Sequence, residues 1–128
     1  MNYDLEPYIV GDTWKGIGTL TFVRNGSAID LTGASAVLEF KKAYEVATPV
    51  VLSLTTANSG IVITAPTSGI LAIPARVLNI PVGMYCWYVT ITLASSEVQT
   101  YMTGTLPVVP KIPFYLNQNV YDHYQIIE

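Results

Sequence analysis

The chain has 128 residues, which suits a single domain, and it carries a formal net charge of −3 with one cysteine, Cys86. A lone cysteine excludes an internal disulfide, and six scattered cations without a basic stripe argue against a nucleic-acid partner. Only 12% of the residues are charged, about half the usual share of a soluble domain. So low a content of charged residues indicates a surface that is buried against other subunits.

One uncharged stretch, 77–96, is long enough to cross a bilayer. Within it, however, lie Asn79, Pro81 and Gly83, and over 85–93 the large apolar residues alternate with others in the period of a β-strand. The first residues of the chain have neither the basic region nor the apolar core of a signal peptide. We therefore expect no membrane insertion.

Short runs rich in β-branched residues, broken by Gly, Pro and Asn, predict an all-β domain of about eight or nine strands, mostly antiparallel. The first half is expected to contain an extended segment over 3–10 and a long strand over 13–23. Asn25-Gly26 tolerates the positive φ angles of a type I′ turn and predicts a hairpin there. A short return strand then ends within 30–33, and two further strands are expected, over 34–42 and 50–54.

In the second half, short strands near 61–64 and 69–73 flank a turn, and 74–78 is expected to form a single helical turn. A long predicted strand, 84–93, turns back into its partner, 98–109. In that partner strand four apolar residues are expected to share one face: Val98, Met102, Leu106 and Val108.

Among all-β architectures, an immunoglobulin-like antiparallel sandwich fits this rhythm best. A jelly roll or a barrel is the alternative, because periodicity does not encode which strands pair. The sandwich is expected over 1–109, with an N-terminal extended segment over 1–10. Within it, Trp87 and Leu20 should be buried and face each other's sheets.

Beyond the last strand, prolines at three-residue spacing cannot continue a central strand, so 110–128 is predicted to be a C-terminal arm that docks on a neighbour. Tyrosines gather near both ends of the chain, and tyrosine provides a large contact area at little entropic cost. The interface candidates are therefore the aromatic and large apolar residues of the two ends: Tyr3, Tyr8, Phe114, Tyr115, Leu116, Tyr121, Tyr124, Ile126 and Ile127.

Chemistry-bearing residues are few. His123 has only a neighbouring aspartate for a partner, and Cys86 is expected to be a small buried residue rather than a nucleophile. Asp4 and Glu6 share a face of the N-terminal segment but lack the further oxygen ligands of a metal site. The glycines of 16–18 indicate a bulge or a close backbone approach, not a phosphate loop. We therefore expect no enzyme, no metal, no cofactor and no small-molecule ligand.

A family resemblance rests on the order of several short motifs, and it covers about residues 9–110. Gly11-Asp12-Thr13, the Asn25-Gly26 hairpin and 29–33 resemble the opening of the N-terminal domain of phage baseplate upper proteins and related tail proteins, and 54–61 and 80–85 are also similar to it. The resemblance implies a β-sandwich that joins virion parts through protein–protein contacts, with no catalytic residues to carry over.

On this basis the expected partners are other virion proteins and copies of the chain itself, and the expected location is the virion, assembled in the bacterial host cytoplasm. Baseplate proteins of this kind continue into a helical trunk and a second domain, whereas this chain ends at Glu128. Tail, baseplate, neck, fibre-adaptor and capsid-surface roles therefore all stay open.

Two other classes of function are alternatives. A secreted or surface binding module, carbohydrate-binding or adhesin-like, should show an exposed aromatic platform on one sheet and usually a signal peptide. A small enzyme should show a cleft with convergent polar residues.

Overall fold

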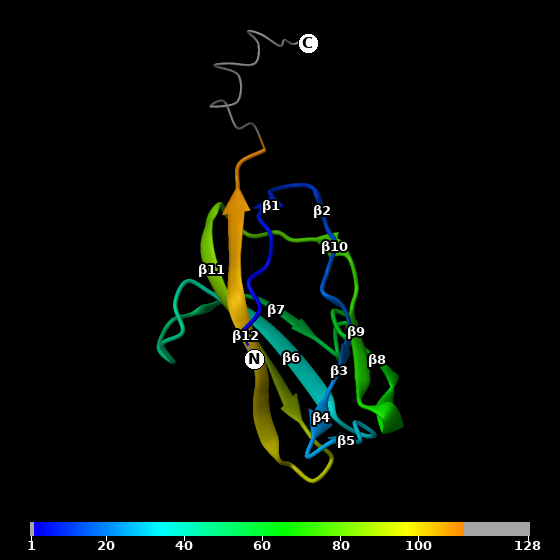
Figure 1. Cartoon of the computed structure of the whole chain (residues 1–128). Coiled ribbons are helices and arrows are strands. Elements are labelled where there is room, and N and C mark those ends of the chain that lie inside the picture. The colour runs from blue at the N-terminus through cyan, green and yellow to red at the C-terminus, as the bar shows by residue number, and fades with distance from the viewer. Residues whose placement is uncertain (1, 112–128) are drawn as a thin grey trace, which may run out of the picture.

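A computed structural model of the chain describes residues 2–111, which form a β-sandwich with one short 3-10 helix (Figure 1). No helix in this part of the chain is long and apolar enough to cross a membrane. The elements in chain order are β1 (Tyr8–Ile9), β2 (Thr13–Trp14), β3 (Gly18–Thr21), β4 (Val23–Arg24), β5 (Ser27–Ala28), β6 (Ser35–Lys41), β7 (Val50–Thr55), β8 (Val62–Ala65), η1 (Pro66–Ser68), β9 (Ile70–Ile73), β10 (Arg76–Val77), β11 (Gly83–Thr92) and β12 (Val98–Val109).

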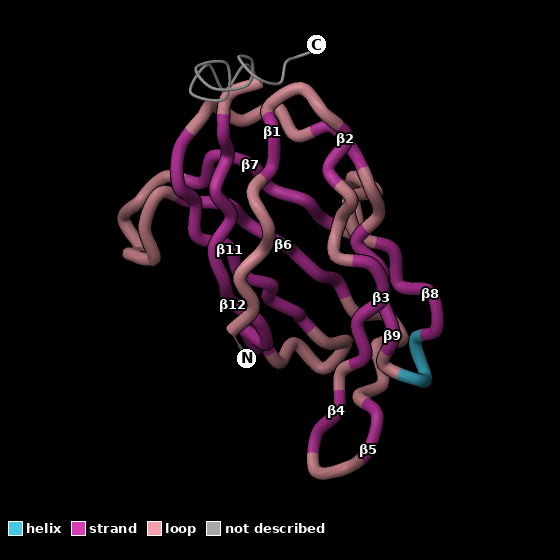
Figure 2. The backbone as a smooth tube through the Cα atoms, turned by 45° about the horizontal axis from the view of Figure 1, so that its top comes forward, coloured by secondary structure: helices cyan, strands magenta, loops and turns pink. Residues whose placement is uncertain are grey.

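The strands form two layers. One is a five-stranded sheet in the order β1-β12-β11-β6-β7, in which β1 runs parallel to β12 and all other pairs are antiparallel. The other contains the three-stranded sheet β3-β9-β8, with the short pairs β10-β2 and β4-β5 at its two ends (Figures 1 and 2). A three-stranded sheet packed on a sheet built around β12, β11 and β6 is the arrangement of an immunoglobulin-like sandwich, so the predicted fold class is confirmed.

A hydrogen bond at the start of β11 also belongs to this architecture. The hydroxyl of Tyr85, a side chain that is fully buried, donates to the carbonyl oxygen of Pro81 at 2.7 Å. In immunoglobulin-like domains such a tyrosine lies near the start of a strand, and its hydroxyl bonds back to the turn that precedes the strand. The apolar alternation of 85–93 predicts that Tyr85 faces inward, but it does not reveal the partner of the hydroxyl.

The core lies between the two layers and is built from alternate residues of each strand. Trp87 and Phe40 of the large sheet are fully buried, and the ring of Phe40 meets Trp14 of β2 edge to face, with 6.0 Å between ring centroids. Burying each large apolar side chain stabilises the fold by about 1.5–3 kcal/mol. The prediction for Trp87 is confirmed, whereas Leu20 is only partly buried at the margin of the core.

The predicted long strand over 13–23 is divided into β2, β3 and β4, and glycines bend the chain between β2 and β3. Gly16 has a φ of +80°, and a Cβ at this position would lie 2.2 Å from the carbonyl oxygen of Ile73. The close backbone approach expected for 16–18 is therefore present. Such divisions explain why the described residues contain twelve strands, more than the rhythm of the sequence indicates.

The hairpin of β11 and β12 has the predicted bounds within a residue, but a bulge changes its register. The pairing shifts between Val89 and Thr90 and makes Tyr101 an extra residue of β12. Because one extra residue reverses which side chains face inward, Val98 lies outside and is 62% exposed. The prediction that Val98 shares the buried face of Met102 is wrong for this reason.

Turns follow the sequence in two places and depart from it in a third. Asn25 and Gly26 have φ angles of 53° and 79°, as a type I′ hairpin requires, and Pro66–Ser68 closes the predicted turn before β9. The helical turn predicted over 74–78 is wrong, because Arg76–Val77 forms β10 and pairs with β2. That pairing joins residues far apart in the sequence, so no local pattern indicates it.

Candidate functional site

The structure describes two of the predicted interface residues, and they differ in exposure. Tyr3 is 50% exposed, so its interface role stays a prediction. Tyr8 is 4% exposed and belongs to the core of its own domain, so the prediction that it contacts another subunit is wrong. The remaining seven candidates of the C-terminal arm lie outside the described residues.

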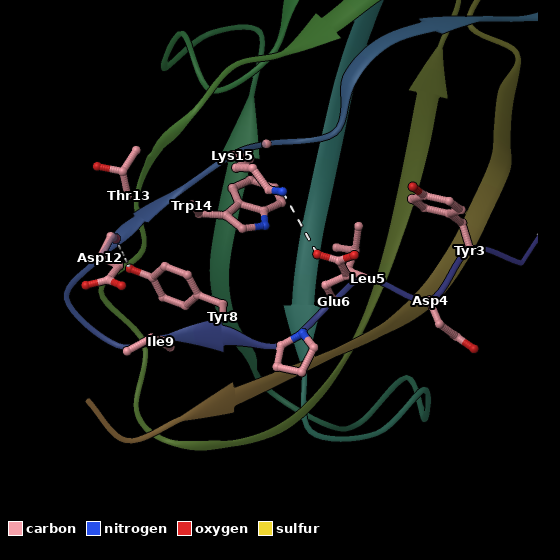
Figure 3. Close-up of a pocket in the computed structure, with 12 residues that line it drawn as sticks. Tyr3, Asp4, Leu5, Glu6, Tyr8, Ile9, Asp12, Thr13, Trp14 and Lys15 are labelled. Atoms are coloured by element: carbon pink, nitrogen blue, oxygen red, sulfur yellow. Dashed lines mark hydrogen bonds and ion pairs between the residues drawn. The ribbon is translucent and has the colours of Figure 1, made fainter. Parts of the chain in front are cut away.

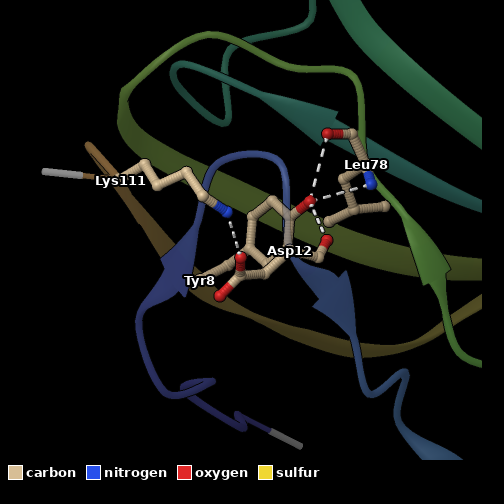
Figure 4. Close-up of polar contacts among 4 residues, drawn as sticks. All are labelled: Tyr8, Asp12, Leu78 and Lys111. Atoms are coloured by element: carbon tan, nitrogen blue, oxygen red, sulfur yellow. Dashed lines mark hydrogen bonds and ion pairs between the residues drawn. The ribbon is translucent and has the colours of Figure 1, made fainter.

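Tyr8 is the centre of a polar cluster at one end of the sandwich (Figure 4). Its hydroxyl donates to the backbone carbonyl of Asp12 at 2.6 Å and accepts a hydrogen bond from the backbone N–H of Leu78 at 3.1 Å. The carboxylate of Asp12 in turn pairs with the ammonium of Lys111 at 2.8 Å. These contacts join the N-terminal segment, the turn after β1, the segment before β11 and the end of β12.

The N-terminal segment extends the large sheet beyond the two residues of β1. The backbone N–H groups of Tyr3 and Leu5 donate to the carbonyl oxygens of Thr103 and Thr105 at 2.7 and 2.9 Å. Gly104 allows this approach, since a Cβ there would lie 1.9 Å from the carbonyl oxygen of Tyr3. The predicted extended segment is therefore an edge strand of the sandwich.

A hollow of about 340 Å³ lies between this segment and β2 (Figure 3). Trp14 and Tyr8 are buried beside it, and Glu6 and Lys15 face each other across it with 3.9 Å between carboxylate and ammonium. Both of these side chains are almost fully exposed, and such ion pairs contribute little to stability. Asp4 instead accepts a hydrogen bond from the Thr105 hydroxyl at 3.0 Å. The two carboxylates thus have separate partners and do not share a cation site.

Groups able to perform acid–base or nucleophilic chemistry are dispersed over residues 2–111. No three His, Cys, Asp or Glu residues in this range lie close enough to hold a metal ion. Cys86 is a free thiol, half-buried on the strand of Trp87. Burial, together with the hydrogen bond that Tyr88 donates to Glu39, raises the pKa of Tyr88 to about 12, so this phenol is neutral at physiological pH. His123 lies outside the described residues.

Three of the four edges of the two main sheets are protected against pairing with another strand. The N-terminal segment carries Pro7 directly after Glu6, and β3 begins at Gly18, whose φ is +80°. The edge of β7 is covered by Asn58, which accepts from the Thr55 N–H at 2.8 Å and donates to the Ser53 carbonyl at 3.1 Å. Proline, charge, local bends and covering loops are the usual ways in which proteins protect exposed edges.

The fourth edge, β8, differs in composition from these, although its pairing with β9 shifts register between Ile63 and Ala65. Its four residues, Val62–Ala65, contain no charge and no proline, and Val62 is 44% exposed. The strand pairs with β9 on one side and is the last strand of its sheet on the other, as Figure 2 shows. The sequence predicts a strand here but not that it forms an edge, because edge position depends on the order of strands.

Comparison with known proteins adds one similar structure. No protein-family model matches the sequence, and no curated protein matches it. Among solved structures, the chain is similar to CopC from Methylosinus trichosporium OB3b, with 14% sequence identity and a TM-score of 0.41. The match covers 81% of this chain and 84% of that chain. At this level of similarity CopC lends no function to this chain.

The comparison corrects the functional prediction. The sequence motifs predict a structural protein of a bacteriophage particle, whereas the similar solved structure is CopC and not a phage tail or baseplate protein. The comparisons do not bear this prediction out, and the proposals below use neither it nor the predicted virion location. The motifs that suggest it are local turn chemistry: Asn25-Gly26 forms a hairpin turn, and the Asp30 carboxylate accepts from the Thr32 N–H at 2.9 Å. Unrelated β-sandwiches use the same turns.

Proposed function

We propose that this chain is a non-catalytic interaction domain that pairs with a second copy of itself along the free edge of β8. The observation that carries the proposal is the contrast between this edge and the other three. An unprotected edge strand presents unpaired backbone N–H and C=O groups to any strand that approaches it. An uncharged edge with an exposed valine is suited to such an approach.

A second copy is the partner that the chemistry of β8 favours. In a symmetric dimer the same strand meets itself in antiparallel orientation, so any charge on it would face a like charge nearby. The strand Val62–Ala65 carries no charge and meets no such repulsion. The sparse charge of the whole chain, 12% of residues, lowers the electrostatic barrier to self-association further.

The non-catalytic role is supported by the structural use of the charged groups in the described part of the chain. Asp12 pairs with Lys111, and Glu97 pairs with Arg24 at 2.7 Å. Glu39 accepts the hydroxyl of Tyr88. These carboxylates hold strands and turns together.

The experiment compares two valine-to-lysine variants. Val62→Lys places a charge on the β8 edge, and Val98→Lys places the same charge on β12, where the native side chain is exposed to a similar degree. We expect the wild type and Val98→Lys to dimerise in sedimentation equilibrium as concentration rises, and Val62→Lys to stay monomeric. Circular dichroism verifies that all three are folded. A wild type that stays monomeric at millimolar concentration, or two variants that dimerise equally, would overturn the proposal.

A further inference from the structure

A loop lies on the outer face of the large sheet and borders a small open hollow there. The loop, 42–49, leaves β6 after Lys41, and the hydroxyl of Tyr44 reaches the carbonyl oxygen of Gly104 on β12 at 2.6 Å. Since β11 lies between β6 and β12 in this sheet, the Tyr44 side chain bridges the outer side of β11. The space below it is lined by Lys41, Tyr44, Val46, Tyr88, Thr100 and Thr103.

Lys41 is the unusual member of this lining. It is 6% exposed and is the one charged side chain that is buried among residues 2–111. Its ammonium donates to the Glu45 carbonyl at a long 3.4 Å and lies 5.7 Å from the centre of the Tyr88 ring. An ammonium has three N–H donors, and burying a charge is costly unless it is paired. In the described part of the chain no carboxylate pairs with Lys41, and the acid beside it in the sheet, Glu39, accepts the Tyr88 hydroxyl.

The rest of the lining defines what kind of anion would fit. The volume is about 340 Å³, within the range of small-ligand sites. The rings of Tyr44 and Tyr88 offer apolar contact, and the hydroxyls of Thr100 and Thr103 can donate and accept. Burial raises the pKa of Tyr44 as well, so neither phenol brings a negative charge into the space at physiological pH.

We propose that this space binds a carboxylate-bearing sugar, with its carboxylate on Lys41 and its ring and hydroxyls against the two tyrosines and two threonines. A carboxylate supplies the negative counter-charge that the Lys41 ammonium lacks. A hydroxylated ring contacts both the aromatic rings and the hydroxyl groups of the lining. The site departs from the expectation that the chain has no small-molecule ligand. It lies on the large sheet, away from β8, and does not depend on self-association.

The test titrates the full chain with glucuronate, glucose and acetate and follows backbone amide signals by NMR. Glucose lacks the carboxylate and acetate lacks the ring. We expect glucuronate to shift the signals of the 42–49 loop and of β12, with binding at least tenfold tighter than for either control compound. Glucose binding as tightly as glucuronate would overturn the role of Lys41, and acetate binding as tightly would overturn the sugar.

Matched variants test whether the ligand binds at Lys41. Lys41→Met keeps most of the buried stem and removes the charge, whereas Lys42→Met removes the neighbouring charge, which lies over the Tyr85 ring instead. Glucuronate binding should weaken at least tenfold in the first and stay unchanged in the second. Val46→Glu changes a side chain that is 95% exposed, so it adds a repelling carboxylate without disturbing the core and should also weaken binding. Absence of glucuronate binding to the wild type, or equal binding to all variants, would overturn the proposal. Val62→Lys should leave glucuronate binding unchanged, which separates this site from the dimer.

Discussion

Replacing Tyr8 with phenylalanine removes one oxygen atom from the interior and leaves the ring in place. In the wild type this oxygen donates to the Asp12 carbonyl at 2.6 Å and accepts from the Leu78 N–H at 3.1 Å. Tyr8 is 4% exposed and Leu78 is 1% exposed, so water cannot readily replace the lost partner. The variant therefore loses a hydrogen bond and leaves a buried donor unsatisfied.

The expected destabilisation follows from these two losses. A typical intramolecular hydrogen bond contributes about 1 kcal/mol net, and an orphaned buried N–H costs about 1–3 kcal/mol. Together they lower the free energy of unfolding by about 2–4 kcal/mol. For a domain of this size that corresponds to a fall in Tm of about 8–15 °C. The loss should be local as well, with faster hydrogen exchange at the Leu78 amide than at the β11 amides.

Urea unfolding followed by tryptophan fluorescence is a suitable assay, because Trp14 and Trp87 are both buried and report on both layers. The control is Tyr3→Phe, which removes the same atom from a side chain that is 50% exposed and should change stability by less than about 0.5 kcal/mol. If Tyr8→Phe is no less stable than this control, the placement of Tyr8 in the core is refuted. The slope of the transition should be the same for all three proteins.

Three further predictions test other parts of the fold. Tyr85→Phe removes the 2.7 Å bond to the Pro81 carbonyl and should lower the free energy of unfolding by about 1–2 kcal/mol in the same urea assay. Gly104→Ala places a Cβ 1.9 Å from the Tyr3 carbonyl oxygen, and this clash should lower the free energy of unfolding by about 1–3 kcal/mol. It should also expose the Tyr3 amide to hydrogen exchange. Because burial raises the pKa of Tyr88 from 10.0 to about 12, the neutral phenol stabilises the fold below pH 10, and that contribution is lost as the pH rises to about 12. An ultraviolet titration should show phenols that ionise late, and Tyr88→Phe should reduce that late phase by one phenol.

Local patterns in the sequence determined much of the fold. The alternation of large apolar residues over 85–93 predicts a strand with Trp87 inside, and β11 has that strand and that face. Asn25-Gly26 predicts a type I′ turn because both residues tolerate positive φ, and both adopt it. These features depend on residues close together in the chain, and they can therefore be predicted from the sequence without the tertiary structure.

Features that depend on strand order were decided by the tertiary structure alone. Tyr8 is indistinguishable from Tyr3 as an end-of-chain tyrosine, and only the parallel pairing of β1 with β12 buries it. A single bulge, invisible in the periodicity, moves Val98 to the outer face.

The two proposed sites arise in the same way. The edge of β8 is free because β9 lies on one side of it and no strand among residues 2–111 pairs with its other side. Lys41 is a surface residue by its alternation in β6, and it is buried where its ammonium meets the 42–49 loop at the Glu45 carbonyl. Local propensity specifies which strands and turns form, whereas their pairing and the path of the connecting loop determine which side chains are covered.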